Sequence, residues 1–164
     1  MVDSDSLLGA VTEGRTGVVR LLMEKGARPS QGSLLRAVTC GHQAIAEALI
    51  EEDTKANQES LAQAAKHGHR NLVRYLHEKG AGVDRGAVQE AVSSGHIEIV
   101  RFLPGRGARL DGIFMGEAIE HRYEEMVSYL LGEGMMPDDS SIKEAERWRQ
   151  LAASPDDRRR SWRI

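Results

Sequence analysis

Apolar and small residues recur along the chain with a period of 27 residues. One position of the period is always alanine: Ala10, Ala37, Ala64, Ala91, Ala118 and Ala145. Each alanine has an apolar residue three positions before it, and each of the first five has a leucine twelve positions after it. A fixed period held over most of a chain is typical of a repeat protein, in which each period is one supersecondary unit.

Each repeat carries two short apolar patterns with helical spacing. In the first repeat, Leu7, Ala10 and Val11 are spaced i, i+3, i+4, which places them on one face of a helix. A second pattern follows after a short break, as at Leu72 and Leu76 in the third repeat. A single pair of helices cannot bury its own apolar face, so the pairs should stack. The pattern therefore predicts an all-α fold, an α-solenoid of helix-turn-helix repeats.

Serine and glycine mark the expected ends of these helices. Ser6, Ser33 and Ser60 stand just before the apolar stripes, where a hydroxyl can cap a helix N-terminus. Glycine readily adopts the positive φ that ends many helices. Glycines follow the first helix at Gly14, Gly41, Gly68 and Gly95, and the second helix at Gly26, Gly80, Gly107 and Gly134.

Three residues interrupt the pattern. Asp53 and Arg122 stand where other repeats have a glycine, and the loop at Asp53 should therefore differ in shape. Pro104 falls late in the second helix of the fourth repeat and should end it early, because proline has no amide N–H to donate.

The period divides the chain into a repeat domain over residues 1–153 and a tail over residues 154–164. We expect five helix pairs and a capping helix, at about 5–30, 31–57, 58–84, 85–111, 112–138 and 140–152. The capping helix is mostly charged, as a terminal repeat must be to stay in solution. The tail contains Arg158, Arg159, Arg160 and Trp162 after a proline, which predicts a flexible, Arg-rich segment.

Several strings make the repeat resemble the ankyrin repeat. The third repeat reads Gly68-His69, then Leu72-Val73, Leu76, Gly80-Ala81 and Asp84, and the strings Gly95-His96-Ile97-Glu98-Ile99-Val100 and Gly41-His42 look the same. The resemblance covers roughly residues 5 to 152. Ankyrin repeats run to about 33 residues, whereas these run to 27, and the missing residues fall between repeats. We therefore expect truncated inter-repeat loops with little or no β-hairpin.

Polar residues that vary between repeats lie on one face of the expected first helices. They stand one position before the key alanine and two and three positions after it, a spacing that shares a face. They are Arg36, Thr39, Cys40, Gln63, Lys66, His67, Glu90, Ser93, Ser94, Glu117, Glu120 and His121, and together they are called the first-helix face below. The resemblance implies that this face lines a concave groove and contacts partners. An ordinary solvated face is the alternative interpretation.

Composition changes this picture little. The chain of 164 residues is 40% hydrophobic, 29% charged and 4% aromatic, with a net charge of −3, which suits a soluble helical protein and argues against nucleic-acid binding. The acidic N-terminus is unlike a signal peptide, and no apolar run is long enough to span a membrane, so we expect a cytoplasmic protein. The single cysteine, Cys40, has no partner for a disulfide.

The remaining chemistry is sparse. His42, His69 and His96 recur at one register, which makes a row rather than the converging ligand set that zinc requires, and the resemblance implies that they support the turn between helices. No residue constellation suggests catalysis, and no cofactor or metal is expected. The sequence therefore predicts a non-catalytic module that binds a protein partner of unknown identity through the first-helix face, as an assumed monomer. One alternative is a small free-standing inhibitor or effector that blocks an enzyme or host factor by occupancy. The other is nucleic-acid contact through the Arg-rich tail.

Overall fold

The computed structural model describes residues 4–152, with the side chains of residues 5–147. This part of the chain consists of eleven α-helices and one 3-10 turn, and it contains no strand. The all-α fold and the absence of β-hairpins between the described repeats are thereby confirmed. The chain forms two compact units, Met1–Arg109 and Leu110–Ile164, called unit 1 and unit 2 below. The predicted Arg-rich tail lies outside the described residues.

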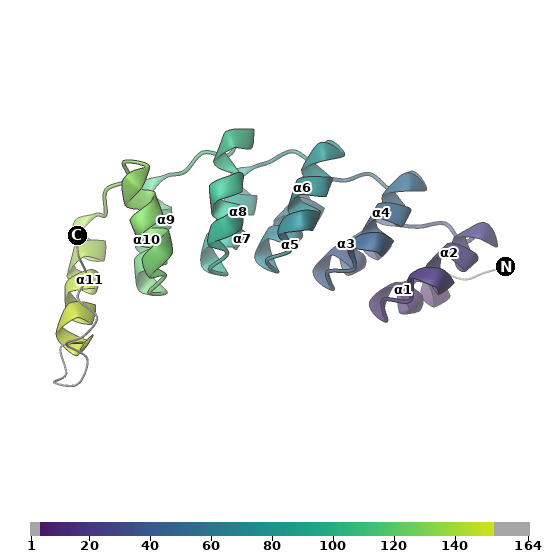
Figure 1. Ribbon diagram of the computed structural model, residues 1–164, viewed down its shortest axis with the longest axis horizontal. Coiled ribbons are helices and arrows are strands. Elements are labelled where there is room, and N and C mark those ends of the chain that lie inside the picture. The colour runs from purple at the N-terminus through teal and green to yellow at the C-terminus, as the bar shows by residue number, and fades with distance from the viewer. Residues whose placement is uncertain (1–3, 153–164) are drawn as a thin grey trace. The chain divides into compact units, whose positions relative to one another are not determined.

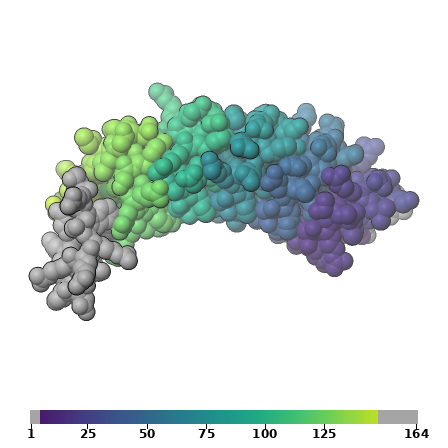
Figure 2. Space-filling view, viewed as in Figure 1, coloured from purple at the N-terminus to yellow at the C-terminus, as the bar shows by residue number. Residues whose placement is uncertain are grey.

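Unit 1 contains four helix pairs that stand side by side in chain order (Figure 1). The pairs are α1 (Ser4–Thr12) with α2 (Thr16–Glu24), α3 (Gln31–Thr39) with α4 (Gln43–Glu51), α5 (Gln58–Lys66) with α6 (Arg70–Glu78), and α7 (Arg85–Ser93) with α8 (Ile97–Phe102). The 3-10 turn η1 (Pro104–Arg106) follows α8. Each first helix packs on the next, from α1 through α3 and α5 to α7. Side chains fill the spaces that the ribbons leave between these pairs (Figure 2).

Unit 2 contains one further helix pair and a longer helix. The pair is α9 (Gly112–Glu120) with α10 (Glu124–Gly132), and the longer helix is α11 (Asp139–Ala152). Helix α9 packs on both α10 and α11.

The repeat period coincides with the buried core. The alanines that mark the period are fully buried in the second to fifth repeats, and so are the leucines twelve positions later. An alanine methyl group is small enough to let neighbouring helices approach closely, while the leucine supplies most of the apolar surface that each second helix removes from water. The described core contains one phenylalanine, Phe114, and is otherwise aliphatic with methionine.

The prediction that Ser33 and Ser60 cap their helices is wrong, because both lie one turn inside. The side chain of Ser30 accepts the amide N–H of Ser33, and Asn57 accepts that of Ser60 at 2.8 Å. Ser60 returns a bond by accepting the amide N–H of Asn57 at 3.1 Å, which completes a capping box. Ser6 likewise lies within α1. These helices begin with a polar turn that precedes the apolar stripe.

The predicted glycine ends are confirmed, and so is the early end of the second helix before Pro104. All eight glycines predicted to end helices have positive φ. The prediction that the loop at Asp53 differs in shape is wrong. Asp53 and Arg122 adopt the same region of φ, at 77° and 58°, although they carry side chains, and the backbone hydrogen bonds around both follow the pattern of the glycine loops. Helix α8 has six residues where the other second helices have nine, and Pro104 opens the 3-10 turn that replaces its last part.

Candidate functional site

In unit 1 the first-helix face occupies the C-terminal halves of α3, α5 and α7 and the residues directly after them. Four of its side chains are exposed, namely Arg36, Cys40, Lys66 and His67. Five are half-buried, namely Thr39, Gln63, Glu90, Ser93 and Ser94. Because α3 packs on α5 and α5 on α7, the structure brings these nine residues into one row.

The remaining three residues of the face lie in unit 2. Glu117 and Glu120 are in α9, and His121 is the C-cap of that helix. Glu117 is half-buried, while Glu120 and His121 are exposed. They hold the same repeat positions as the residues in unit 1.

Charges on the face are partly paired within unit 1. The ammonium group of Lys66 lies 3.2 Å from a carboxylate oxygen of Glu90, so an ion pair joins α5 to α7. Both side chains are partly exposed, and the contribution of such a pair to stability is small. Arg36, on the neighbouring helix α3, has no ion-pair partner among the described residues. The uncompensated charge on this part of the face is therefore positive and is located on α3.

The hydroxyl of Ser93 is used within its own helix. It donates to the backbone carbonyl of Gln89 at 2.8 Å, and its oxygen accepts a bond from the side-chain amide of Gln89 at 3.4 Å. Ser93 is therefore less available to a partner than the exposed side chains of Arg36 or Lys66.

Three histidines connect the helix pairs of unit 1 in a way that the sequence analysis did not anticipate. The Nε2 atoms of His42, His69 and His96 lie 3.3, 3.3 and 3.0 Å from the carbonyl oxygens of Thr12, Thr39 and Lys66. A carbonyl can only accept, so Nε2 is the donor in each contact. We call this repeated bond the histidine link. Each link runs from the start of a second helix to the end of the first helix in the preceding pair.

Each linking histidine also restricts the turn of the preceding repeat, because its ring lies against the glycine of that turn. A Cβ atom added to Gly41 would lie 2.6 Å from the ring of His69, and the corresponding contacts at Gly14 and Gly68 are equally short. The link also holds the first-helix face in place, because two of the accepting carbonyls belong to Thr39 and Lys66. A histidine 30 residues after a threonine or lysine is a pattern that sequence inspection alone could have found.

A hollow of about 390 Å³ lies between α1 and α3, beside the first-helix face. It is lined by Asp5, Leu8, Ser30, Gly32, Ser33, Leu35, Arg36 and Thr39. Two members of the predicted face, Arg36 and Thr39, therefore line a concave surface. The leucines, Gly32 and Asp5 are residues that the sequence analysis did not single out.

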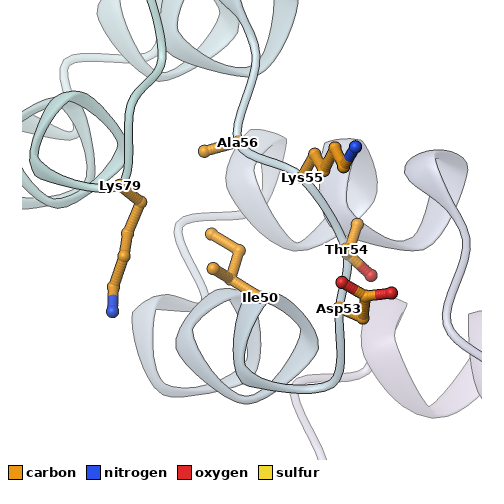
Figure 3. Close-up of a pocket in the computed structure, with 6 residues that line it drawn as sticks. All are labelled: Ile50, Asp53, Thr54, Lys55, Ala56 and Lys79. Carbon is orange, nitrogen blue, oxygen red and sulfur yellow. The ribbon is translucent and has the colours of Figure 1, made fainter.

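A second hollow, of about 270 Å³, lies at the ends of the second helices (Figure 3). Its two lysines do not converge: the ammonium groups of Lys55 and Lys79 point away from each other (Figure 3). The ammonium group of Lys79 instead lies 5.4 Å from the centre of the Tyr75 ring. This hollow contains no set of groups that could hold a ligand between them.

The described residues contain no cluster of three histidine, cysteine or acidic side chains able to hold a metal ion. Cys40 is exposed and, among these residues, forms no disulfide. In the same part of the chain, no helix has the length and apolar character needed to cross a membrane.

Comparison with known proteins places these features in context. A family model described as ankyrin repeats (3 copies) matches residues 34–113 and 61–141, which together cover well over half of the chain. The crystal structure of the human ASB11 ankyrin repeat domain is similar, with a TM-score of 0.75 and 25% sequence identity. That match covers 86% of this chain and 76% of the ASB11 domain. No curated protein matches the chain in sequence.

Proposed function

Because the chain belongs to the ankyrin repeat family, whose repeats are protein–protein interaction modules, we propose that it binds a protein partner, without catalysis, through the first-helix face. The observation that carries the proposal is the contrast between neighbouring positions on the first helices. The key alanines are constant and buried, whereas the position just before them carries Arg36, Gln63 and Glu90. A constant scaffold that presents different side chains from repeat to repeat suits recognition of an irregular surface.

The ion pair between Lys66 and Glu90 allows a sharp test of this face. Exchanging the two residues, as Lys66→Glu with Glu90→Lys, keeps a pair between α5 and α7 but reverses the charges presented to a partner. We expect the exchanged protein to fold normally and to recover less than about one tenth of the partner in affinity purification, a loss that corresponds to about 1.4 kcal/mol.

A matched control lies on the second helices of the same repeats. Arg70 and Glu98 form an ion pair of 3.5 Å between α6 and α8, and exchanging them makes the same kind of change away from the first-helix face. We expect this control to recover the partner as the wild type does. Equal recovery by the two exchanged proteins would overturn the assignment of the face, and circular dichroism would verify that both are folded.

A further inference from the structure

The hollow between α1 and α3 has an apolar floor that the rest of the first-helix row lacks. Leu8 is 37% exposed and Leu35 is half-buried, and both line the hollow. The same repeat position carries Ala62 in α5 and Gln89 in α7. Leucine side chains exposed in a hollow remain hydrated and gain free energy when another apolar group covers them.

One of the residues that line the hollow, Gly32, has no side chain. Gly32 is the second residue of α3 and does not have the positive φ that would require glycine. A Cβ atom at this position would meet only the hydroxyl of Ser30, at an ordinary distance of 3.6 Å. The corresponding residue is Glu59 in α5 and Gly86 in α7. The backbone therefore does not require glycine at residue 32, and there is room for a side chain at this place beside the hollow.

Opposite charges lie at the wall of the hollow. Arg36 and Asp5 both line it, and neither has an ion-pair partner among the described residues. The next charges along the face, Lys66 and Glu90, pair with each other. The two charges beside the leucines are thus the ones left for a partner to meet.

We infer that this hollow receives an aliphatic side chain of the protein partner, flanked by a carboxylate that pairs with Arg36 and a cationic group that pairs with Asp5. The inference rests on the proposed function, since it assigns the chemistry of the partner segment bound at one part of the first-helix face. The aliphatic side chain covers Leu8 and Leu35 and contributes most of the affinity, and the two charges select the direction of the segment.

The test uses a random peptide library displayed on phage and selected on the full chain. We expect enriched peptides to contain leucine, isoleucine or valine between an acidic and a basic residue. Gly32→Leu fills the hollow with an aliphatic side chain and removes a helical glycine, so the variant should fold at least as well as the wild type. It should bind the selected peptides about tenfold more weakly or worse.

Gly17→Leu is the matched control. Gly17 is the second residue of α2, and a Cβ atom there would have no neighbour within 4 Å. This variant adds the same side chain outside the hollow and should bind the peptides as the wild type does. Arg36→Glu should bind the selected peptides more weakly, because their acidic residue loses its partner. A new selection on this variant should enrich peptides with a basic residue in place of the acidic one.

The outcomes separate this inference from the proposed function. In one outcome, the peptides bind Gly32→Leu as tightly as the wild type but bind the Lys66/Glu90 exchanged protein more weakly. This result would overturn the hollow as a binding site and leave the first-helix face as the proposed binding surface. Peptides insensitive to both changes overturn both. Failure to enrich any peptide over an unrelated protein also overturns the inference.

Discussion

The second to fourth helix pairs of unit 1 and the helix pair of unit 2 use the same two repeat positions differently. In unit 1 a glycine precedes a histidine, and each histidine forms a histidine link to the preceding pair. In unit 2 these positions are Arg122 and Tyr123, and Tyr123 stacks on His121 with ring centres 5.5 Å apart, much as His69 stacks on His67 at 6.1 Å in unit 1. The backbone follows the same path in both units, so the difference lies in the side chains at these two positions.

The difference shows that glycine meets two separate requirements in unit 1. The turn needs positive φ, and the ring of the next repeat leaves no room for a Cβ atom. At Arg122 only the first requirement applies, because the next repeat position in the sequence is Gln150 rather than a histidine. Arginine is tolerated there at the cost of backbone strain alone, about 1–2 kcal/mol.

The substitutions with the largest expected effect test whether the two units lose stability independently. Leu76 and Leu130 hold the same repeat position and are fully buried, one in each unit. Replacing either by alanine should destabilise its unit by about 2–5 kcal/mol, because a cavity remains. Hydrogen exchange should show Leu130→Ala exposing amides of α9 and α10 while those of α3 to α6 keep their protection. Equal loss of protection throughout the chain would show that the units unfold together.

The second prediction separates the two requirements for glycine in unit 1. Gly41→Ala should cost about 2–4 kcal/mol, since it combines the strain of positive φ with a clash against His69. In a His69→Ala background the same substitution should cost only about 1–2 kcal/mol, because the ring is gone. Chemical denaturation of the four proteins in this cycle measures the difference. Additive effects would mean that the ring of His69 does not restrict residue 41.

The third prediction concerns a substitution that relieves backbone strain in unit 2. Arg122→Gly should stabilise unit 2 by roughly 1 kcal/mol, because glycine adopts a φ of 58° without steric conflict. Asp53→Gly is the comparison in unit 1 and should gain less, since aspartate tolerates this region better than arginine. Thermal unfolding of both variants measures the gains. A larger gain at Asp53 than at Arg122 would contradict this account of the turn.

The smallest expected effect concerns the helix caps. The caps of α3 and α5 are the neutral residues Ser30 and Asn57, whereas Asp138 accepts the amide N–H of Ser141 in α11 at 2.7 Å. That bond lowers the pKa of Asp138 below its ordinary value of 3.8. The stabilising effect is therefore complete above this value and is lost as the pH falls through the lowered pKa. Amide exchange at Ser141 should accelerate in this acid range, and Asp138→Asn should abolish the dependence on pH.

The fold was predicted from the sequence, but the helix caps and the histidine links between repeats were not. The 27-residue period located the core alanines and leucines because burial constrains residue type directly. The helix starts were missed because their first turn is polar and precedes the apolar stripe. Serine, asparagine or aspartate seven residues before the key alanine, as at Ser30, Asn57 and Asp84, would have revealed them.

The candidate site was predictable in outline only. The period placed the first-helix face on α3, α5 and α7, since residues at i, i+3 and i+4 share a helix surface. The pairing of Lys66 with Glu90 depends on the distance between neighbouring helices, and the hollow is lined by residues of both α1 and α3. Both are consequences of packing between repeats, which a pattern within one repeat does not contain. Binding through this face stays a prediction.

The histidine link also has a direction. In all three cases the donor belongs to the later repeat and the acceptor to the earlier one. During synthesis on the ribosome, the carbonyl oxygens of Thr12, Thr39 and Lys66 emerge first and remain hydrated until the histidine 30 residues later follows. A chain that emerges N-terminus first therefore presents each acceptor before its donor, and a histidine link can form only after the following repeat has left the exit tunnel.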